Sequence, residues 1–314
     1  MRENKKKQGM LLGNLILFCA MAPCAAPYAL GSEMDEDGVR RLPAASGVRG
    51  GLVVHIGCGD RRLTAGLRAG EGYLVHGLDT DSANVEKARK YIRTKGLYGT
   101  VSVDTFDGKR LPYADNLVNL IVAEDLGDVS MDEATRVLAP LGVAVIGGKK
   151  TVKPWPEDID EWTHYLHDAT GNPVASDSVV GPPRRMQWTG GPRWARQHDH
   201  LASLTAMVSS GGRVFYIMDE GSRASILLPS KWTLVARDAF NGAILWKRPI
   251  ETWVAHLFAF KSGPAYLPRR LVAVTDRVYV TLGRPCAGER IGRDVGQHDP
   301  DLSGNGRRWR SVSP

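Results

Sequence analysis

Two glycines and an aspartate stand where a chain could hold a nucleotide-type cofactor. Gly57 and Gly59 directly follow the apolar run 52–56, and a helical pattern comes next. Glycines at such a turn let the backbone approach a ligand, and the free N–H groups of the helix start face it. Asp79 ends the next apolar run, about 20 residues on, where an acidic side chain can accept both ribose hydroxyls. This spacing predicts a ribosyl-cofactor site; the alternative is that the glycines serve only the geometry of the turn.

A parallel sheet is needed to bring these residues together, and the surrounding hundred residues predict one. Short apolar runs alternate with helical patterns, which is typical of α/β structure. The expected strands are 52–56, 73–78, 101–103, 117–122 and 143–146. The expected helices are 62–69, a segment capped by Asp81 or Ser82 and ended by Gly96, and 132–138. The sequence therefore predicts a Rossmann-like α/β domain over residues 48–150.

Four phrases in this region resemble the motifs of class I S-adenosylmethionine methyltransferases. Residues 55–59 (His-Ile-Gly-Cys-Gly) and 77–81 (Gly-Leu-Asp-Thr-Asp) resemble the first two motifs. Residues 107–116 look like the third motif, and 136–142 resemble the turn before the fifth strand. The resemblance implies S-adenosylmethionine as the cofactor. A dinucleotide-binding loop would instead read GxGxxG, and here the last position is Arg62.

The resemblance also implies a role for each candidate site residue. Gly57 and Gly59 would cradle the methionine part, Asp79 the ribose and Asp107 the adenine edge. His55 and Cys58, in the same phrase as the glycines, are counted in the cofactor site. Glu124 and Asp125, which end the fourth strand, are the candidates for a catalytic base.

The chain departs from the family pattern at three points. His55 stands where the family usually has an acidic residue, and Arg61 where a further glycine is common. No hairpin is expected after the fifth strand, and a connector rich in proline and tryptophan, residues 151–210, replaces the segment that would shape an acceptor pocket. A domain retained without activity is therefore the alternative to an active methyltransferase.

After residue 211 the pattern becomes all-β. Strands are expected at 213–217, 232–237, 243–246 and 276–280, and Asn241-Gly242 predicts a hairpin turn. Residues 234–246 resemble the repeat of pyrroloquinoline-quinone-like β-propellers, and the whole chain is similar to bacterial exported proteins that join the two kinds of domain. A partial propeller is expected over 211–283. Too few blades are present to close a ring, so we expect no quinone binding. Residues 284–314 lack an apolar period and are expected to be irregular and not native coding sequence.

The first 32 residues have the order of a secretory signal. Lys5-Lys6-Lys7 precede an apolar run, and Ala29 and Gly31 follow it. This predicts an exported, periplasmic or envelope protein. The alternative is that the segment is retained as a membrane anchor, and the protein would contact a membrane only through it.

Other polar clusters and the overall charge indicate little chemistry. Glu161, His164, His167 and the patch 198–200 could bind a metal, but hydrogen-bonded histidines in a polar connector are the simpler interpretation, and no metal site is predicted. The net charge of +7 is not organised into a basic run with aromatics, so no nucleic-acid partner is expected. The sequence thus predicts methyl transfer to a protein or small-molecule acceptor of unknown identity. The alternative is a non-catalytic envelope protein that binds or scaffolds partners.

Overall fold

The structure is a computed structural model of the whole chain. It describes residues 36–59, 61–179, 181–182, 186–191, 203–225, 227–250, 253, 268–281 and 309–312. The predicted signal segment 1–32 and the histidine patch 198–200 lie outside the described residues. Within the described part of the chain, no helix is long and apolar enough to cross a membrane.

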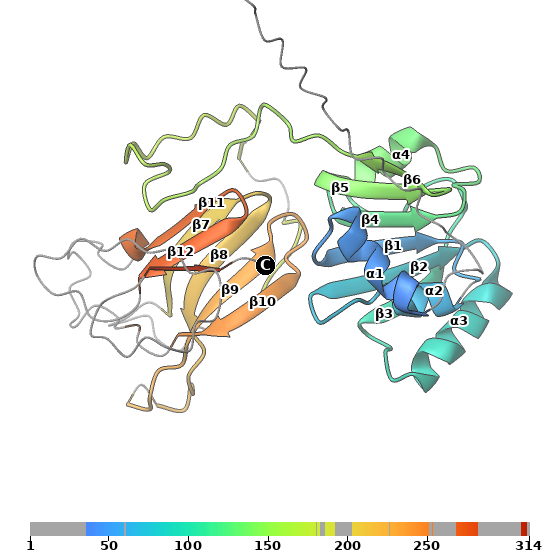
Figure 1. Cartoon of the computed structure of the whole chain (residues 1–314), viewed down its shortest axis with the longest axis horizontal. Helices are drawn as coiled ribbons and strands as arrows, with labels where there is room; N and C mark the ends of the chain where they lie inside the picture. Colours follow the sequence, from blue (N-terminus) through green and yellow to red (C-terminus); the bar gives the residue numbers. More distant parts are fainter. Residues whose placement is uncertain are drawn as a thin grey trace, which may run out of the picture.

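The first unit is built on a six-stranded sheet in the order β3-β2-β1-β4-β5-β6 (Figure 1). Its strands are β1 (Gly51–Ile56), β2 (Tyr73–Asp79), β3 (Val101–Thr105), β4 (Val118–Ala123), β5 (Leu138–Ile146) and β6 (Lys149–Val152). The first five are parallel, which confirms the predicted Rossmann-like α/β sheet. β6, which was not expected from the sequence, runs antiparallel to β5; among the described residues no seventh strand joins this sheet. Gly147 and Gly148, both with positive φ, make the turn that joins the two strands.

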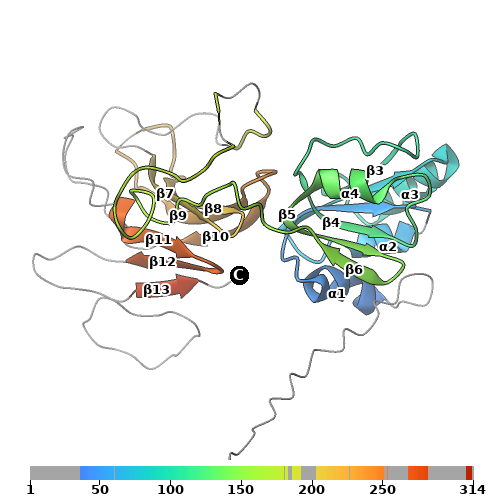
Figure 2. The same cartoon turned by 90° about the horizontal axis from the view of Figure 1, so that it is seen from above.

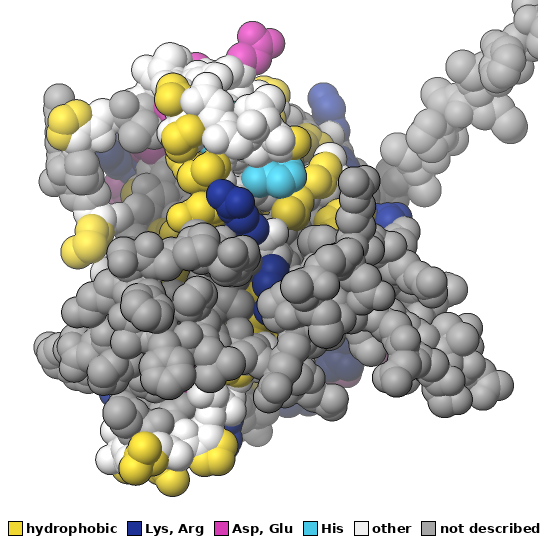
Figure 3. Space-filling view, turned by 90° about the vertical axis from the view of Figure 1, so that its left-hand side faces the viewer, with side chains coloured by type: hydrophobic (Ala, Val, Ile, Leu, Met, Phe, Trp, Pro, Cys, Tyr) yellow, Lys and Arg dark blue, Asp and Glu magenta, His cyan; other side chains and the backbone are white. Residues whose placement is uncertain are grey.

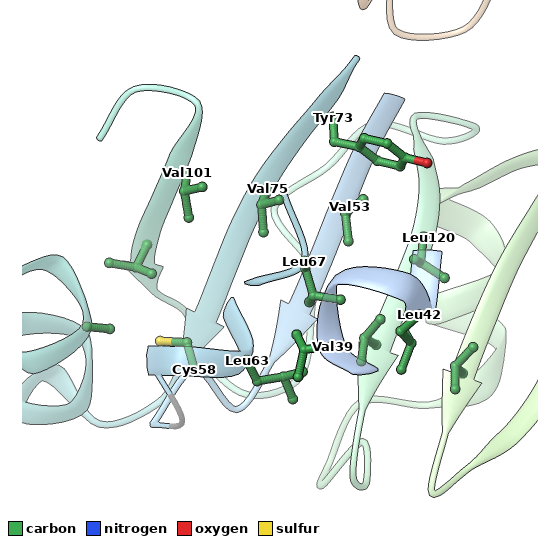
Figure 4. Close-up of a cluster of buried hydrophobic side chains, with 14 of the residues drawn as sticks. Val39, Leu42, Val53, Cys58, Leu63, Leu67, Tyr73, Val75, Val101 and Leu120 are labelled. Carbon is green, nitrogen blue, oxygen red and sulfur yellow. The ribbon is translucent and has the colours of Figure 1, made fainter. Parts of the chain in front are cut away.

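Helices cover the two faces of this sheet unequally. α1 (Glu36–Ser46), α2 (Arg61–Gly66) and α3 (Ser82–Thr94) lie on one face, where Val39, Leu63 and Ile92 pack against strand residues such as Val53 (Figure 4). α4 (Met131–Val137) and the segment 106–117 cover the other face. α1 was not predicted, because Pro43 inside it interrupts the helical signal.

The predicted boundaries of α3 are confirmed by its caps. The Asp81 side chain accepts a hydrogen bond from the N–H of Ala83, which satisfies one of the unpaired donors at the helix start. Gly96 ends the helix in the left-handed region at φ +68°. Between these ends Val85, Ala88 and Ile92 form the buried face, so α3 is fixed directly beyond β2.

The second unit is all-β (Figure 2). β7 (Leu204–Ser210), β8 (Arg213–Asp219), β9 (Trp232–Asp238) and β10 (Ile244–Pro249) form an antiparallel sheet in the order β10-β9-β8-β7. β11 (Leu271–Val274), β12 (Arg277–Thr281) and β13 (Trp309–Val312) form a second one after the short 3-10 helix η1 (Pro268–Arg270). The predicted turn at Asn241-Gly242 is confirmed, with Gly242 at φ +72°.

One strand of the second unit was not expected. β13 pairs with β12 over Trp309–Val312, so the expectation that residues 284–314 are irregular throughout is wrong there. The free edge of β12 offers unpaired backbone groups that a short extended segment can satisfy, even without an apolar period.

The connector is fixed to the second unit by hydrogen bonds. The Glu161 carboxylate accepts from the Ser210 hydroxyl at 3.1 Å and from the N–H of Gly211. The N–H of Ser209 donates to the Trp162 carbonyl at 2.7 Å. This part of the connector therefore covers the second unit and not the first.

Candidate functional site

The predicted site residues follow neighbouring strands at one edge of the first sheet. Ile56 at the end of β1 pairs with Leu78 of β2 and with Ala123 of β4. Asp79 pairs with Thr105 at the end of β3. Because parallel strands end at the same edge, the loops after β1, β2, β3 and β4 meet there, which is where open α/β sheets bind ligands.

The Asp79 side chain connects two of these loops by hydrogen bonds. It is only 8% exposed, and its Oδ2 accepts from the N–H of Gly59 at 3.1 Å. Its Oδ1 accepts from the N–H of Asp81 at 2.9 Å, and Asn84 Nδ2 lies 3.3 and 3.4 Å from the two oxygens. The carboxylate therefore fixes the glycine loop to the start of α3. These contacts already occupy the roughly four acceptor positions of the carboxylate, so a ligand hydroxyl would have to replace the two longest of them, those from Asn84.

The glycine loop is open where a ligand would approach. Gly57 has φ +86°, and a Cβ added to it would meet no atom within 4 Å. Its N–H donates to the Leu78 carbonyl at 2.8 Å, which holds the loop against β2. Gly59 is tighter, since its Cβ would lie 3.2 Å from Asn84 Nδ2. Among the described residues, the space beside Gly57 is therefore free for a ligand to approach the backbone.

The structure corrects the assignments of Cys58 and His55. Cys58 is fully buried among the side chains under α2 and α3 (Figure 4), and burial raises the pKa of its thiol to about 12. Its N–H is bonded to the Leu78 carbonyl. His55 is 2% exposed, and its Nδ1 lies 2.8 Å from the Thr64 hydroxyl. Neither side chain reaches the open side of the loop, because both lie between the sheet and the helices.

Asp107 lies in the adjoining loop after β3. The N–H of Phe106 donates to the Asp79 carbonyl at 3.2 Å, which brings the two loops together. Asp107 is exposed, and its Oδ1 accepts from the N–H groups of Arg110 and Lys109, both at 2.8 Å. These backbone hydrogen bonds hold the pKa of the carboxyl below its usual value. Asp107 thus stabilises its own turn at the site edge, and its contact with an adenine stays a prediction.

Glu124 and Asp125 follow β4 at the same edge. Both are exposed, and Asp125 Oδ1 accepts from the N–H of Gly127 at 2.7 Å. Since Ala123 pairs with Ile56, Glu124 begins the loop beside Gly57. The loop that carries both carboxylates therefore starts beside the glycine loop, while neither carboxylate is hydrogen-bonded to the glycine loop among the described residues.

Arg61 is directed away from the glycine loop. Its guanidinium carbon lies 5.9 Å from the centre of the Tyr91 ring, in the last turn of α3. Asn84, which borders Gly59, is in the first turn of the same helix. The Arg61 side chain therefore runs along α3 toward its far end.

Two further residues shape the site and were not singled out from the sequence. Asn84 contacts the Asp79 carboxylate, and its position in the first turn after the Asp79–Asp81 phrase could have indicated this. Arg136 of α4 fixes the segment after Asp107, because it bonds to the carbonyls of Leu111 and Tyr113 and to Asp115. Only the fold shows that α4 lies over this segment.

The histidines of the connector have structural partners. His167 Nε2 lies 2.7 Å from Asp160 Oδ2, and His164 Nδ1 lies 2.8 Å from the Thr163 hydroxyl. Over the residues that the structure covers, no three histidine, cysteine or acidic side chains are grouped as metal ligands.

Comparison with known proteins agrees with this geometry over the first unit. Residues 53–142 match the family model described as a methyltransferase domain. Methyltransferase GfsG of Streptomyces halstedii is 34% identical over 118 residues, which are 36% of this chain and 41% of that protein. Among solved structures, the [4+2]-cyclase SpnF matches with a TM-score of 0.31 and 25% identity, over 36% of this chain and 48% of that one. A geranyl diphosphate methyltransferase in complex with GPP and sinefungin matches with a TM-score of 0.29 and 23% identity, over 31% of this chain and 38% of that one.

The first unit is therefore a methyltransferase domain. Its sheet edge carries the glycine loop and Asp79 of the site described above. The chain spans less than half the length of the curated relative that it matches. These matches do not specify an acceptor.

Proposed function

We propose that the protein binds S-adenosylmethionine at the edge formed by Gly57, Gly59, Asp79 and Asp107, and transfers its methyl group to an acceptor. The observation that carries the proposal is the hydrogen bond between Asp79 and the N–H of Gly59, which sets an acidic side chain against an open glycine loop. A ribose fits there because its hydroxyls are donors and the carboxylate is an acceptor. The methionine part would lie along Gly57.

The chain's contribution to the reaction is chiefly to position the reactants. Bound S-adenosylmethionine would supply a methyl group on a sulfonium, and its demethylated product, a neutral thioether, would be left when that methyl–sulfur bond breaks and the acceptor–methyl bond forms. Holding both reactants in a reactive geometry lowers the entropic cost of the step. Glu124 or Asp125, exposed beside the loop, would take the proton that the acceptor loses.

Calorimetry with S-adenosylmethionine and its demethylated product tests the cofactor. We expect both to bind, and Asp79→Asn to weaken binding by about 1.5–3 kcal/mol, the range for hydrogen bonds to a charged group. Asp132→Asn, an exposed acid in the first turn of α4, is the matched control and should bind like the wild type. No heat from the wild-type protein would exclude catalysis by this domain.

The bases are tested by methyl transfer with a library of small-molecule and protein acceptors. Glu124→Gln or Asp125→Asn should lower kcat by about 100-fold or more while cofactor affinity is kept. A fall in affinity with unchanged kcat would show that these carboxylates hold the cofactor instead.

A second candidate function is a non-catalytic binding or scaffold role for the all-β unit. We propose that its antiparallel sheets are blades of a pyrroloquinoline-quinone-like propeller without quinone. Figure 3 shows hydrophobic side chains at several separate places on the face that it presents. Met207 is 55% exposed and Leu227 is 89% exposed. Such side chains support a protein partner, and this candidate predicts a stable complex with an envelope protein even when Asp79 is replaced.

Export is proposed on the order of charges and apolar residues in the first 32 positions. Protein recovered from cells should begin near Ser32 or Glu33 and lie in the periplasm or envelope. An intact Met1 on protein from the cytoplasm would contradict this.

A further inference from the structure

A cavity lies between the two units, far from the proposed cofactor site. It has a volume of about 180 Å³ and is lined by Gly50 before β1, Asn119 near the start of β4, and Leu141 in β5. From the second unit it is lined by the β7–β8 turn, by Arg213 and by residues near the β9–β10 turn. The first-unit residues stand near the beginnings of parallel strands, whereas Gly57 and Asp79 stand at or beyond their ends. The two sites are therefore at opposite edges of the sheet.

Arg213 is an unusual residue to find in this cavity wall. Its side chain is partly buried, yet it makes no hydrogen bond or ion pair with any residue that the structure describes. A guanidinium carries five N–H donors, and where no protein group accepts from them they are left to the solvent or to a ligand in the cavity. Burial, and next the charge of Arg49, lower the pKa of Arg213. The Arg213 guanidinium thus places donors and a positive charge in the cavity wall without an acceptor in the part of the chain that the structure describes.

The charges of two acidic side chains, Asp238 and Asp276, act on Arg213, but both acids contact other residues. Asp238 accepts three hydrogen bonds, from the N–H groups of Phe240 and Asn241 at 2.8 and 2.9 Å and from Asn119 Nδ2 at 2.7 Å. Asp276 is exposed and lies 3.9 Å from the Arg277 guanidinium. Both acids attract Arg213 at a distance, and neither forms an ion pair with it. With Arg49 and Arg213 against Asp238, the lining carries one net positive charge.

The rest of the lining suits a small anion that has an apolar part. Arg49 is exposed at the cavity, while Phe240, Leu245 and Trp246 add apolar surface. We propose that this cavity binds a small oxyanion, a carboxylate or a phosphate, whose oxygens accept hydrogen bonds from Arg213 and whose charge is balanced by Arg213 and Arg49. Arginine suits this role because its planar fork matches the oxygens of both groups. The inference does not depend on the methyltransferase proposal.

Calorimetry on the full chain tests the site with acetate, benzoate and inorganic phosphate, each against sodium chloride at matched ionic strength. Binding of at least one probe is expected, and Arg213→Gln should weaken it by about tenfold or more. Benzoate as the tightest binder would indicate an organic carboxylate, and phosphate as the tightest would indicate a phosphate. Arg223→Gln, an exposed arginine in the β8–β9 loop, is the matched control and should bind like the wild type.

Thermal unfolding separates a ligand-binding Arg213 from a structural one. Because its charge has no partner in the described residues, Arg213→Gln should leave the Tm without ligand equal to or above that of the wild type, and only the wild type should gain stability from the anion. Asp79→Asn should not change anion binding, since Asp79 is at the other edge of the sheet. The proposal is overturned if no probe binds the wild type, if Arg213→Gln binds equally well, or if Arg213→Gln lowers the Tm without ligand.

Discussion

His76 in β2 shows how one buried residue makes the stability of the first unit depend on pH. Its Nδ1 lies 2.7 Å from the Tyr113 hydroxyl, and burial lowers the pKa of the imidazole. The unfolded chain therefore takes up a proton near pH 6.5 that the folded chain takes up only at lower pH. The unfolded state binds more protons in that window, so the free energy of unfolding falls as the pH falls through it.

Replacing His76 by Gln should remove this part of the pH dependence. Denaturant unfolding between pH 5 and pH 7.5 measures it as the slope of the free energy of unfolding against pH. Tyr113→Phe is the matched control: it removes the hydroxyl but keeps the burial, the larger cause of the shift, so its slope should remain. An unchanged slope in His76→Gln would show that other groups produce it.

Arg61 is predicted to be neutral for cofactor binding. Its guanidinium lies over Tyr91 at the far end of α3 and not over the glycine loop. Arg61→Gly should therefore leave the affinity for S-adenosylmethionine within about twofold of the wild type, and cost stability through the lost cation–π contact, about 0.5–1 kcal/mol. Calorimetry and thermal unfolding check the two effects. A tenfold change in affinity in either direction would place the side chain at the loop.

At the scale of residues, the sequence predicts which residues are brought together. It predicts less well where their side chains point. Gly57, Gly59 and Asp79 are brought together as expected, because apolar runs ending in such residues define strand ends. The direction of a side chain within the turn is set by the tertiary packing of α2 and α3. The pattern of the motif therefore could not show that Cys58 and His55 face the core.

At the scale of elements, strands with strong apolar runs were predictable and short or interrupted elements were not. The five parallel strands and α3 follow from alternation and caps. α1 buries Val39 and Leu42, but Pro43 interrupts its helical pattern. β6 has the sequence Lys-Lys-Thr-Val with every residue exposed, so it carries no apolar signal. β6 exists because β5 offers an edge and two glycines allow the turn. Such elements depend on neighbours that no local pattern contains.

Arg136 links α4 to the segment after Asp107, and its loss should loosen both. It donates to both oxygens of Glu133, to Asp115 and to two carbonyls of the 106–117 segment. Hydrogen bonds from Arg136 also hold the pKa of Glu133 below its usual value, so their stabilisation is present at neutral pH and is lost as the pH falls through that lowered pKa.

Arg136→Gln should therefore lower the free energy of unfolding by about 1.5–3 kcal/mol at pH 7, and by less below pH 4. Chemical denaturation measures this at both pH values. Arg40→Gln, an exposed arginine of α1, is the control and should change stability by about 0.5 kcal/mol or less. An equal loss at both pH values would show that the ionised Glu133 is not the partner that matters.

At the scale of the whole molecule, the two units meet at the edge of the sheet opposite to the proposed cofactor site. Leu245 approaches Gly72 so closely that a Cβ on the glycine would lie 2.7 Å from the Leu245 carbonyl oxygen. Asn119 joins the units by hydrogen bonds. Its Oδ1 accepts from the N–H of Leu52 at 2.8 Å and from Asn241 Nδ2 at 2.7 Å, and its Nδ2 donates to Asp238. Among the residues that the structure describes, the all-β unit thus contacts the sheet edge opposite to the loops that follow the parallel strands.

Asn119→Ala should uncouple the units without changing the cofactor edge. The substitution removes all three hydrogen bonds at once and leaves the buried Asp238, whose pKa burial already raises, with one donor fewer. We expect the free energy of unfolding to fall by about 1–3 kcal/mol, because donors and acceptors are left unpaired. Calorimetry should then show separate unfolding transitions for the two units.

Limited proteolysis gives a second measurement. It should cut the connector between residues 153 and 202 faster than in the wild type, because the first unit is then no longer held against the second. Asn172→Ala, in an exposed part of the connector, is the matched control and should unfold like the wild type. Binding of S-adenosylmethionine should not change, since Gly57 and Asp79 stand at the other ends of the strands. A single transition at the wild-type temperature would mean that other contacts hold the units together without Asn119, such as the hydrogen bond from Asn241 Nδ2 to the Leu117 carbonyl and the approach of Leu245 to Gly72.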